Sequence, residues 1–163
     1  MKNILSVLVE NRAGVLARTA GLFARRGFNI ESLAVGETED ATVSRMTIVT
    51  EGDEHIVEQV SKQLNKQIDV IKVKILDSEQ STRREMALIK VHASPETRGQ
   101  VFDIASIMNT KVVDLSAATL TIEICDRPER VELLLDMLEP YGIAEMARTG
   151  MVAMQKGSGS IGK

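Results

Sequence analysis

Residues 3–26 of the chain read NILSVLVENRAGVLARTAGLFARR, and the spacing of their hydrophobic residues changes near the middle of this stretch. The pattern over residues 3–10 predicts a β-strand. From Gly14 to Arg26 the apolar positions recur at helical spacing, which predicts an amphipathic helix. One face of that helix carries Val15, Leu16, Thr19, Leu22 and Phe23. Gly27 follows two arginines, as is typical at the end of a helix.

The two patterns continue to alternate further along the chain. Residues 30–37 predict a second strand, and residues 46–48 mark the strand that returns beside it. Asp53 is typical of an N-cap and opens a second predicted helix. Residues 69–76 alternate between apolar and polar side chains, as a half-buried strand does. The predicted order is therefore βαββαβ.

The same order is then repeated. Strands are predicted over residues 85–93, 111–115, 119–124 and 144–155, with helices after Ser94 and after Asp126. Ser94 is followed by Pro95, and proline is favoured at the first position of a helix. Asp126 begins a stretch that resembles a capping box, the N-terminal signature of a helix.

Two βαββαβ units predict the α+β class, as two tandem ferredoxin-like sandwiches whose antiparallel sheets carry helices on one face. We divide the chain into a first domain (residues 1–77), a linker (78–84), a second domain (85–156) and a tail (157–163). The Gly and Ser content of the tail predicts flexibility. The sheet face without helices still carries apolar residues. We therefore expect another domain or chain to cover it, and we expect an oligomer.

The composition argues against several functional classes. The net charge is -3, with three Phe, one Tyr and no Trp, so neither positive charge nor an aromatic platform favours nucleic-acid binding. The apolar runs are far shorter than the ~20 residues of a membrane span, and no signal peptide is recognisable. The single cysteine, Cys125, cannot form an internal disulfide. These features favour a cytoplasmic protein that binds neither nucleic acid nor a membrane.

Residues that could support catalysis are few. Neither His55 nor His92 has metal-ligand spacing to another histidine, to Cys125 or to a close acidic pair. Cys125 is not part of a nucleophile motif. The acidic residues within 37–40 and 51–54 lack the spacing of a calcium loop, and no glycine-rich phosphate loop occurs. We therefore predict no catalytic residue, no metal site and no cofactor in this chain.

The loop after the first strand and the start of the first helix, residues 11–16, have the composition of a ligand site. Gly14 lets the backbone approach a ligand closely, or adopt a conformation that is costly for other residues. The unpaired N–H groups of the first helical turn suit a carboxylate, and Asn11 adds a side-chain amide. From spacing alone, an ordinary strand-to-helix turn is the simpler interpretation.

The stretch from Ile4 to Leu16 resembles the opening of an ACT domain, an amino-acid-binding regulatory module. Residues 21–33 (GLFARRGFNIESL) and 44–48 (SRMTI) resemble the small, regulatory subunit of acetohydroxyacid synthase, which is also called acetolactate synthase. The chain length, the second βαββαβ unit and the segment EMARTG (145–150) are similar as well. The resemblance therefore covers nearly the whole chain.

This resemblance implies a subunit that has no active site of its own. It implies binding to a large catalytic subunit, which uses thiamine diphosphate, Mg²⁺ and FAD and serves the biosynthesis of valine, leucine and isoleucine. The small subunit would raise that activity and confer feedback inhibition by valine. The resemblance also implies a homodimer whose ACT domains pair side by side around the bound valine. The implied valine-binding residues are Asn11, Gly14, Val15 and Leu16 of one chain with Asn29 and Ile30 of its partner.

Three alternatives stay open at this point. A stand-alone ACT-type sensor could control another enzyme or a transcription factor, and the loop alone does not exclude it. An enzyme on a ferredoxin-like scaffold is opposed by the lack of a paired base and nucleophile. A structural assembly factor would bind no amino acid, and the choice among valine, leucine and isoleucine depends on the shape of the pocket.

Overall fold

The computed structural model describes residues 2–162, and its contacts divide the chain into two compact units. The first unit runs to Arg83 and also contains the segment from Gly150 onward. The second unit extends from Arg84 to Thr149. Both units have the order βαββαβ and an antiparallel sheet, which confirms the predicted α+β class.

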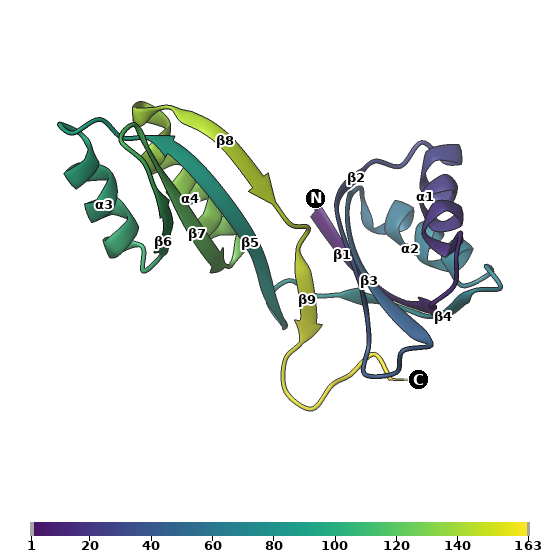
Figure 1. Ribbon diagram of the computed structural model, residues 1–163. Coiled ribbons are helices and arrows are strands. Elements are labelled where there is room, and N and C mark those ends of the chain that lie inside the picture. The colour runs from purple at the N-terminus through teal and green to yellow at the C-terminus, as the bar shows by residue number, and fades with distance from the viewer. Residues whose placement is uncertain (1, 163) are drawn as a thin grey trace. The chain divides into compact units, whose positions relative to one another are not determined.

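The first unit is a four-stranded antiparallel sheet with two helices on one face (Figure 1). Its elements are β1 (Lys2–Glu10), α1 (Val15–Arg25), β2 (Ile30–Glu37), β3 (Val43–Glu51), α2 (Glu54–Leu64) and β4 (Val70–Leu76). The strand order is β2-β3-β1-β4, so β2 and β4 form the edges. As predicted, Asp53 caps α2, because its carboxylate accepts a hydrogen bond from the Ile56 N–H at 2.9 Å.

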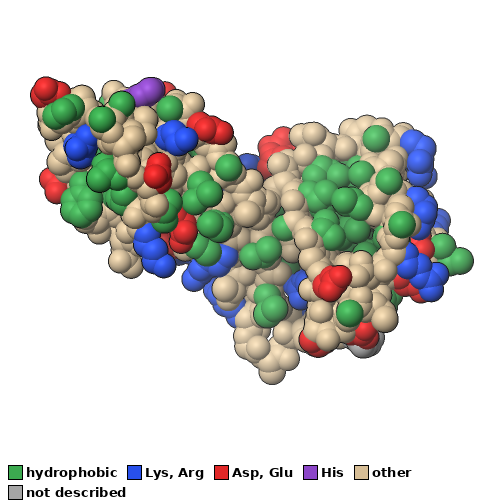
Figure 2. Space-filling view, viewed as in Figure 1, with side chains coloured by type: hydrophobic (Ala, Val, Ile, Leu, Met, Phe, Trp, Pro, Cys, Tyr) green, Lys and Arg blue, Asp and Glu red, His purple; other side chains and the backbone are tan. Residues whose placement is uncertain are grey.

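Alternation along β1 places the main core of this unit between the sheet and the helices. Leu5, Val7 and Val9 are buried in one cluster with Phe23 of α1 and Leu64 of α2. Removing these side chains from water is the main force that holds the helices on the sheet. The side chains of β2, at the edge of the sheet, are less buried than those of β1. Figure 2 shows hydrophobic side chains gathered at the surface in the region of β2 and α2.

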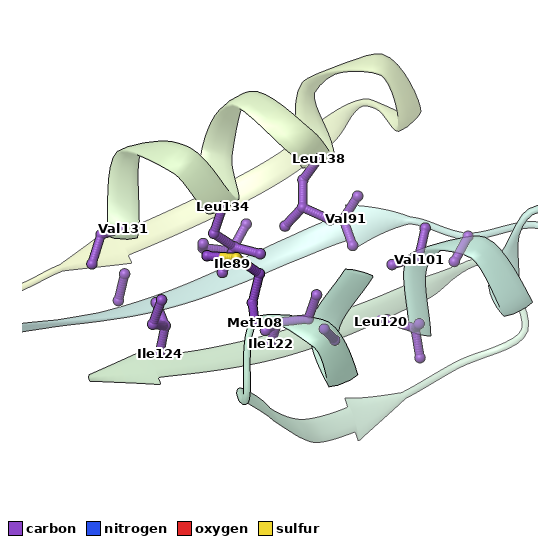
Figure 3. Packing of buried hydrophobic residues seen from close by; sticks show 13 residues of the cluster. Ile89, Val91, Val101, Met108, Leu120, Ile122, Ile124, Val131, Leu134 and Leu138 are labelled. Atoms are coloured by element: carbon purple, nitrogen blue, oxygen red, sulfur yellow. The ribbon is translucent and has the colours of Figure 1, made fainter. Parts of the chain in front are cut away.

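The second unit repeats the design with its own core. Its elements are β5 (Ser81–His92), α3 (Arg98–Ile107), β6 (Lys111–Leu115), β7 (Thr119–Asp126), α4 (Pro128–Leu138), a 3₁₀ helix (Glu139–Tyr141) and β8 (Ile143–Arg148). The sheet order is β6-β7-β5-β8. Figure 3 shows Leu134 of α4 against Ile89 of β5, and Ile122 of β7 lies beside them in the same buried cluster. β5 begins inside the predicted linker.

The predicted start of α3 differs from the structure. The helix begins at Arg98, and Pro95 lies in the turn before it. The backbone N–H groups of Thr97 and Arg98 both donate to the Ser94 carbonyl, at 3.1 Å and 2.8 Å. Ser94 therefore closes this turn with its carbonyl and is not the N-cap of the helix.

The end of the chain also departs from prediction, because residues 144–155 do not form one strand. β8 ends at Arg148, and a separate strand, β9 (Val152–Gln155), follows it. We call residues 150–162 the C-terminal strap, and they belong to the first unit. The observed units thus divide the chain differently from the predicted second domain and tail, which met at residue 157.

Apolar residues explain why the strap folds onto the first unit. It covers the sheet face opposite α1 and α2, where two buried clusters contain Met151, Ala153 and Ile161 of the strap with Ile4, Leu8, Val43, Val49 and Leu76 of the sheet. Ile161 lies in the stretch whose glycines and serines predicted flexibility. The face that we expected a domain or another chain to cover is thus covered by the chain's own end.

The backbone of the strap passes very close to the backbone of β2. A Cβ atom added to Gly150 would lie 2.3 Å from the Leu33 carbonyl oxygen, so no side chain fits at this position. One residue further on, the Met151 N–H donates to the Ser32 hydroxyl at 2.8 Å. These contacts fix where the strap enters the outer face of the sheet.

Candidate functional site

The loop after β1 is held by backbone hydrogen bonds. The Asn11 N–H donates to the Thr42 carbonyl at 2.8 Å, which ties the loop to the turn between β2 and β3. Gly14 precedes α1 with φ +85°, a left-handed conformation that glycine adopts at little cost. Among the described residues no side chain caps α1. The first turn of the helix therefore keeps N–H groups that a ligand can use.

The side chain of Asn11 is exposed but already engaged. Its amide nitrogen donates to the Glu37 carboxylate at 3.0 Å and to the Ala41 carbonyl at 2.9 Å. Both amide hydrogens are used in this way, so the side chain has its carbonyl oxygen left to offer a ligand. Glu37 lies 26 residues away in sequence, and no local pattern pointed to it.

Val15 and Leu16 have different surroundings at the start of α1. The Val15 side chain is buried in the main core, so it anchors the helix and does not face a ligand. The Leu16 side chain is 45% exposed. Of this pair, only Leu16 offers apolar side-chain surface to a ligand.

Arg18 is a neighbour of the loop that sequence reasoning missed. Its guanidinium lies over Gly14, since a Cβ atom at that glycine would be 2.9 Å from Nη1. Asp69 holds the group in place, with Nε and Nη2 at 2.8 Å and 2.7 Å from the same carboxylate oxygen. The helical spacing between positions 14 and 18 would have indicated this neighbourhood.

Asn29 and Ile30 lie at the opposite end of the same sheet. β2 and β1 both pair antiparallel with β3, so they run parallel to each other. Ile30 pairs with Thr50, whereas Glu10, next to the loop, pairs with Val43. Seven residues of β3 separate these points, which corresponds to about 23 Å. A single chain therefore does not bring the two groups of predicted residues together.

A pocket of about 410 Å³ adjoins the loop on its β3 side. Its lining is Glu10, Asn11, Arg12, Ala41, Thr42, Val43 and Ile71. Of the six residues implied by the family resemblance, Asn11 alone lines this pocket. The pocket thus reaches the loop at Asn11 and Arg12 but does not include the start of the helix.

Other functional groups are sparse in the part of the chain that the structure describes. No three His, Cys, Asp or Glu side chains between residues 2 and 162 are grouped as metal ligands would be. Cys125 is exposed and unpaired with another cysteine, and His55 shares a hydrogen bond of 2.8 Å with Gln59. Over the same residues, no helix is long and apolar enough to cross a membrane.

The two ferredoxin-like units, together with a family match over the first of them, place the chain in the class of ACT-domain regulatory proteins. Residues 5–72 match the family model of the AHAS small subunit-like ACT domain, and residues 84–157 match that of the small subunit of acetolactate synthase. The chain belongs to the acetolactate synthase small-subunit family, and it is a regulatory subunit. The family resemblance seen in the sequence is confirmed.

Individual relatives agree along nearly the whole length. A probable acetolactate synthase small subunit from Archaeoglobus fulgidus is 53% identical, with 97% of this chain and 99% of the relative covered. The acetolactate synthase small subunit from Bacillus subtilis is 45% identical, with 97% and 92% covered. The crystal structure of that subunit from Thermotoga maritima superposes with a TM-score of 0.90 at 40% identity, covering 98% of this chain and 99% of the other.

Proposed function

We propose that this subunit binds valine between two copies of the chain, activates the large catalytic subunit and makes it sensitive to valine. The observation that carries the proposal is the uncapped start of α1 behind Gly14, in the same loop as Asn11, whose side-chain carbonyl oxygen is left to offer a ligand. A free amino acid has a carboxylate, an ammonium group and a side chain. The loop supplies chemistry for the first two, and Leu16 together with a partner chain supplies a surface for the third.

The carboxylate of valine suits the N–H groups of the first turn of α1, where the helix dipole is positive. Its ammonium group suits acceptors, and Asn11 Oδ1 and the Glu37 carboxylate are two acceptors at the loop. Leu16 contributes exposed apolar surface from the same chain. Val15 takes part through its backbone, because its side chain is in the core.

The position of β2 explains how a second chain completes the site. β2 is an edge strand, and a second copy can pair with it antiparallel to extend the sheet. Within one chain, β2 and β1 run in the same direction. When the β2 strands of two chains pair antiparallel, the start of one β2 therefore lies at the end of the partner's sheet where β1 finishes. Asn29 and Ile30 of one chain then approach the Asn11–Leu16 loop of the other.

Apolar residues along β2 support this mode of pairing. Phe28, Ile30 and Leu33 are only partly buried within one chain, and Val35 is 45% exposed. An apolar sheet edge of this kind is typical of a protein–protein contact. The strap closes the outer sheet face, and the β2 edge is an apolar surface on which two first units can meet.

Feedback follows if valine favours one arrangement of the two chains over another. The catalytic subunit would respond to this arrangement without touching valine. A coupling free energy of about 1–3 kcal/mol suffices for useful inhibition. Thiamine diphosphate, Mg²⁺ and FAD would all belong to the catalytic subunit.

The test is a valine titration of the enzyme reconstituted from both subunits. We expect this chain to copurify with the catalytic subunit, to raise its turnover and to confer inhibition by valine at lower concentrations than by leucine or isoleucine. Activation without valine inhibition would favour an assembly factor. Valine binding without association would favour a stand-alone sensor, and pyruvate turnover by this chain alone would favour an enzyme.

A further inference from the structure

A second pocket, of about 450 Å³, lies between the outer face of the first sheet and the C-terminal strap. Its apolar lining consists of Leu8, Val43 and Leu76 from the sheet with Met154 and Ile161 from the strap. Ligand pockets for small organic molecules have volumes of this order. The apolar lining suits a ligand with an apolar group.

Two basic side chains line the same pocket. Arg45 Nη2 donates to the Ala153 carbonyl at 2.8 Å. Lys74 Nζ donates to the Gln155 side chain and, at 3.1 Å, to the Ser160 carbonyl. Both side chains are half-buried, and among residues 2–162 neither is ion-paired with a carboxylate.

Their partners are therefore neutral groups, although a half-buried cation is normally compensated by an anion. Burial lowers the pKa of Arg45, because desolvation disfavours its charged form. Arg45 has five N–H donors and Lys74 has three. The hydrogen bonds to the strap use one N–H of Arg45 and two of Lys74, so donors remain on both side chains for an anionic ligand.

The acidic residues Glu37 and Glu39 also line the pocket, and they restrict the charge of the ligand. Two carboxylates beside the two cations oppose a dianion such as phosphate. An inorganic ion would also leave the apolar lining without contacts. A single negative charge attached to a short apolar group matches all of these features.

We propose that this pocket binds a small organic monocarboxylate. Arg45 and Lys74 hold its carboxylate, and the apolar residues of the sheet and strap enclose its hydrocarbon part. The pocket includes neither Gly14 nor the first turn of α1, although Glu37 also contacts Asn11 and Val43 also lines the pocket beside the loop. Because the ligand contacts both sheet and strap, its binding stabilises the closed strap.

The test is a titration of the full chain with isobutyrate, followed by NMR of ¹³C-methyl-labelled methionine. We expect a saturable shift of the Met154 methyl signal, while that of Met46, in the opposite core, does not move. Isobutyramide has the same shape without the charge, and we expect it to bind at least about tenfold more weakly. Inorganic phosphate should cause no saturable shift.

Variants test whether the carboxylate binds at Arg45 and Lys74 and not elsewhere in the chain. Arg45→Gln and Lys74→Gln should each weaken isobutyrate binding by about tenfold or more. Ser32→Ala removes a strap contact without touching either cation, so it should lower the affinity less than either charge variant does. Gly14→Asp, which acts at the proposed valine site, should also leave the Met154 response unchanged.

Several results would overturn the proposal. These are the absence of a saturable Met154 shift, equal binding of isobutyramide, binding of phosphate as strong as that of isobutyrate, and unchanged affinity in both charge variants. Because the comparison of isobutyrate with isobutyramide uses the unmodified chain, it decides the matter even if a variant does not fold. Loss of the Met154 response in Gly14→Asp would place the ligand at the valine site instead.

Discussion

Gly14 shows how a single residue combines a structural and a functional constraint. Its φ of +85° favours glycine, and the guanidinium of Arg18 occupies the space that a side chain would need. Any substitution therefore introduces backbone strain of about 1–2 kcal/mol. A test of charge at this position needs a control with the same strain.

Gly14→Asp and Gly14→Asn form such a matched pair. Both side chains tolerate a left-handed backbone better than most, and they differ in charge. We expect Asp to raise the valine concentration needed for inhibition at least about tenfold more than Asn does, because its carboxylate repels that of valine. Activation of the catalytic subunit should persist in both, and the measurement is a valine titration of the reconstituted enzyme. Equal effects of the two variants would show that charge at this position is irrelevant to valine.

Gly150 imposes a different constraint, since the carbonyl of Leu33 fills the space beside it. We expect Gly150→Ala to lower the free energy of unfolding by about 1–3 kcal/mol, as overpacking does. Urea denaturation checks this. Gly99 is the control, because it lies in α3 and a Cβ atom there would meet nothing within 4 Å. Gly99→Ala should be neutral or slightly stabilising, and a similar loss in both variants would contradict the packing argument.

At the scale of elements, a titratable carboxyl group, that of Asp126, lies just before α4. Burial alone raises the pKa of the Asp126 carboxyl. Hydrogen bonds from the Arg127 N–H and the Arg130 guanidinium, with the charges of Arg130 and Arg84, outweigh burial and hold the pKa below its usual value. A depressed pKa means that the stabilisation is present above the unfolded pKa and is lost as pH falls through the folded one.

Asp126→Asn should therefore destabilise the protein near neutral pH and have little effect in acid. The loss should be at most about 1 kcal/mol, because the ion pair with Arg130 is partly exposed. The difference between variant and unmodified chain should shrink below about pH 4, where the unfolded carboxyl takes up its proton. Urea denaturation at pH 7 and pH 3 measures it, and a constant difference would argue against this role.

At the scale of the whole molecule, the strap makes the first unit dependent on both ends of the chain. Met151, Ala153 and Ile161 cover apolar residues that a free sheet face would present to water. A sheet face exposed in this way favours association with another chain. The strap thus leaves the edge of the sheet as the contact that we propose for dimerisation.

A chain that ends at residue 149 should form larger assemblies than the full chain does. A chain that ends at residue 156 keeps β9 and loses the cover from Ile161 and the Ser160 carbonyl that accepts from Lys74, so its change should be smaller. Light scattering during size-exclusion chromatography measures both. Identical masses for all three chains would show that the strap does not control association.

The sequence by itself determined the two βαββαβ repeats, the helix cap at Asp53 and the glycine that precedes the first helix. These features are local, because hydrophobic period, capping and turn residues act within a few positions of one another. The family followed from them too, since distinctive residues in and beyond the loop suffice for recognition.

Only the tertiary structure decided which distant residues meet. It placed Glu37 against Asn11, joined Arg45 to Ala153 across 108 residues, and set Asn29 at the far end of the sheet from the loop. It also showed that Ile161, in a stretch rich in glycine and serine, packs against Leu8 and Val43 of the first sheet. Such contacts depend on which surfaces remain uncovered once the elements have packed, and no local pattern in the sequence encodes that.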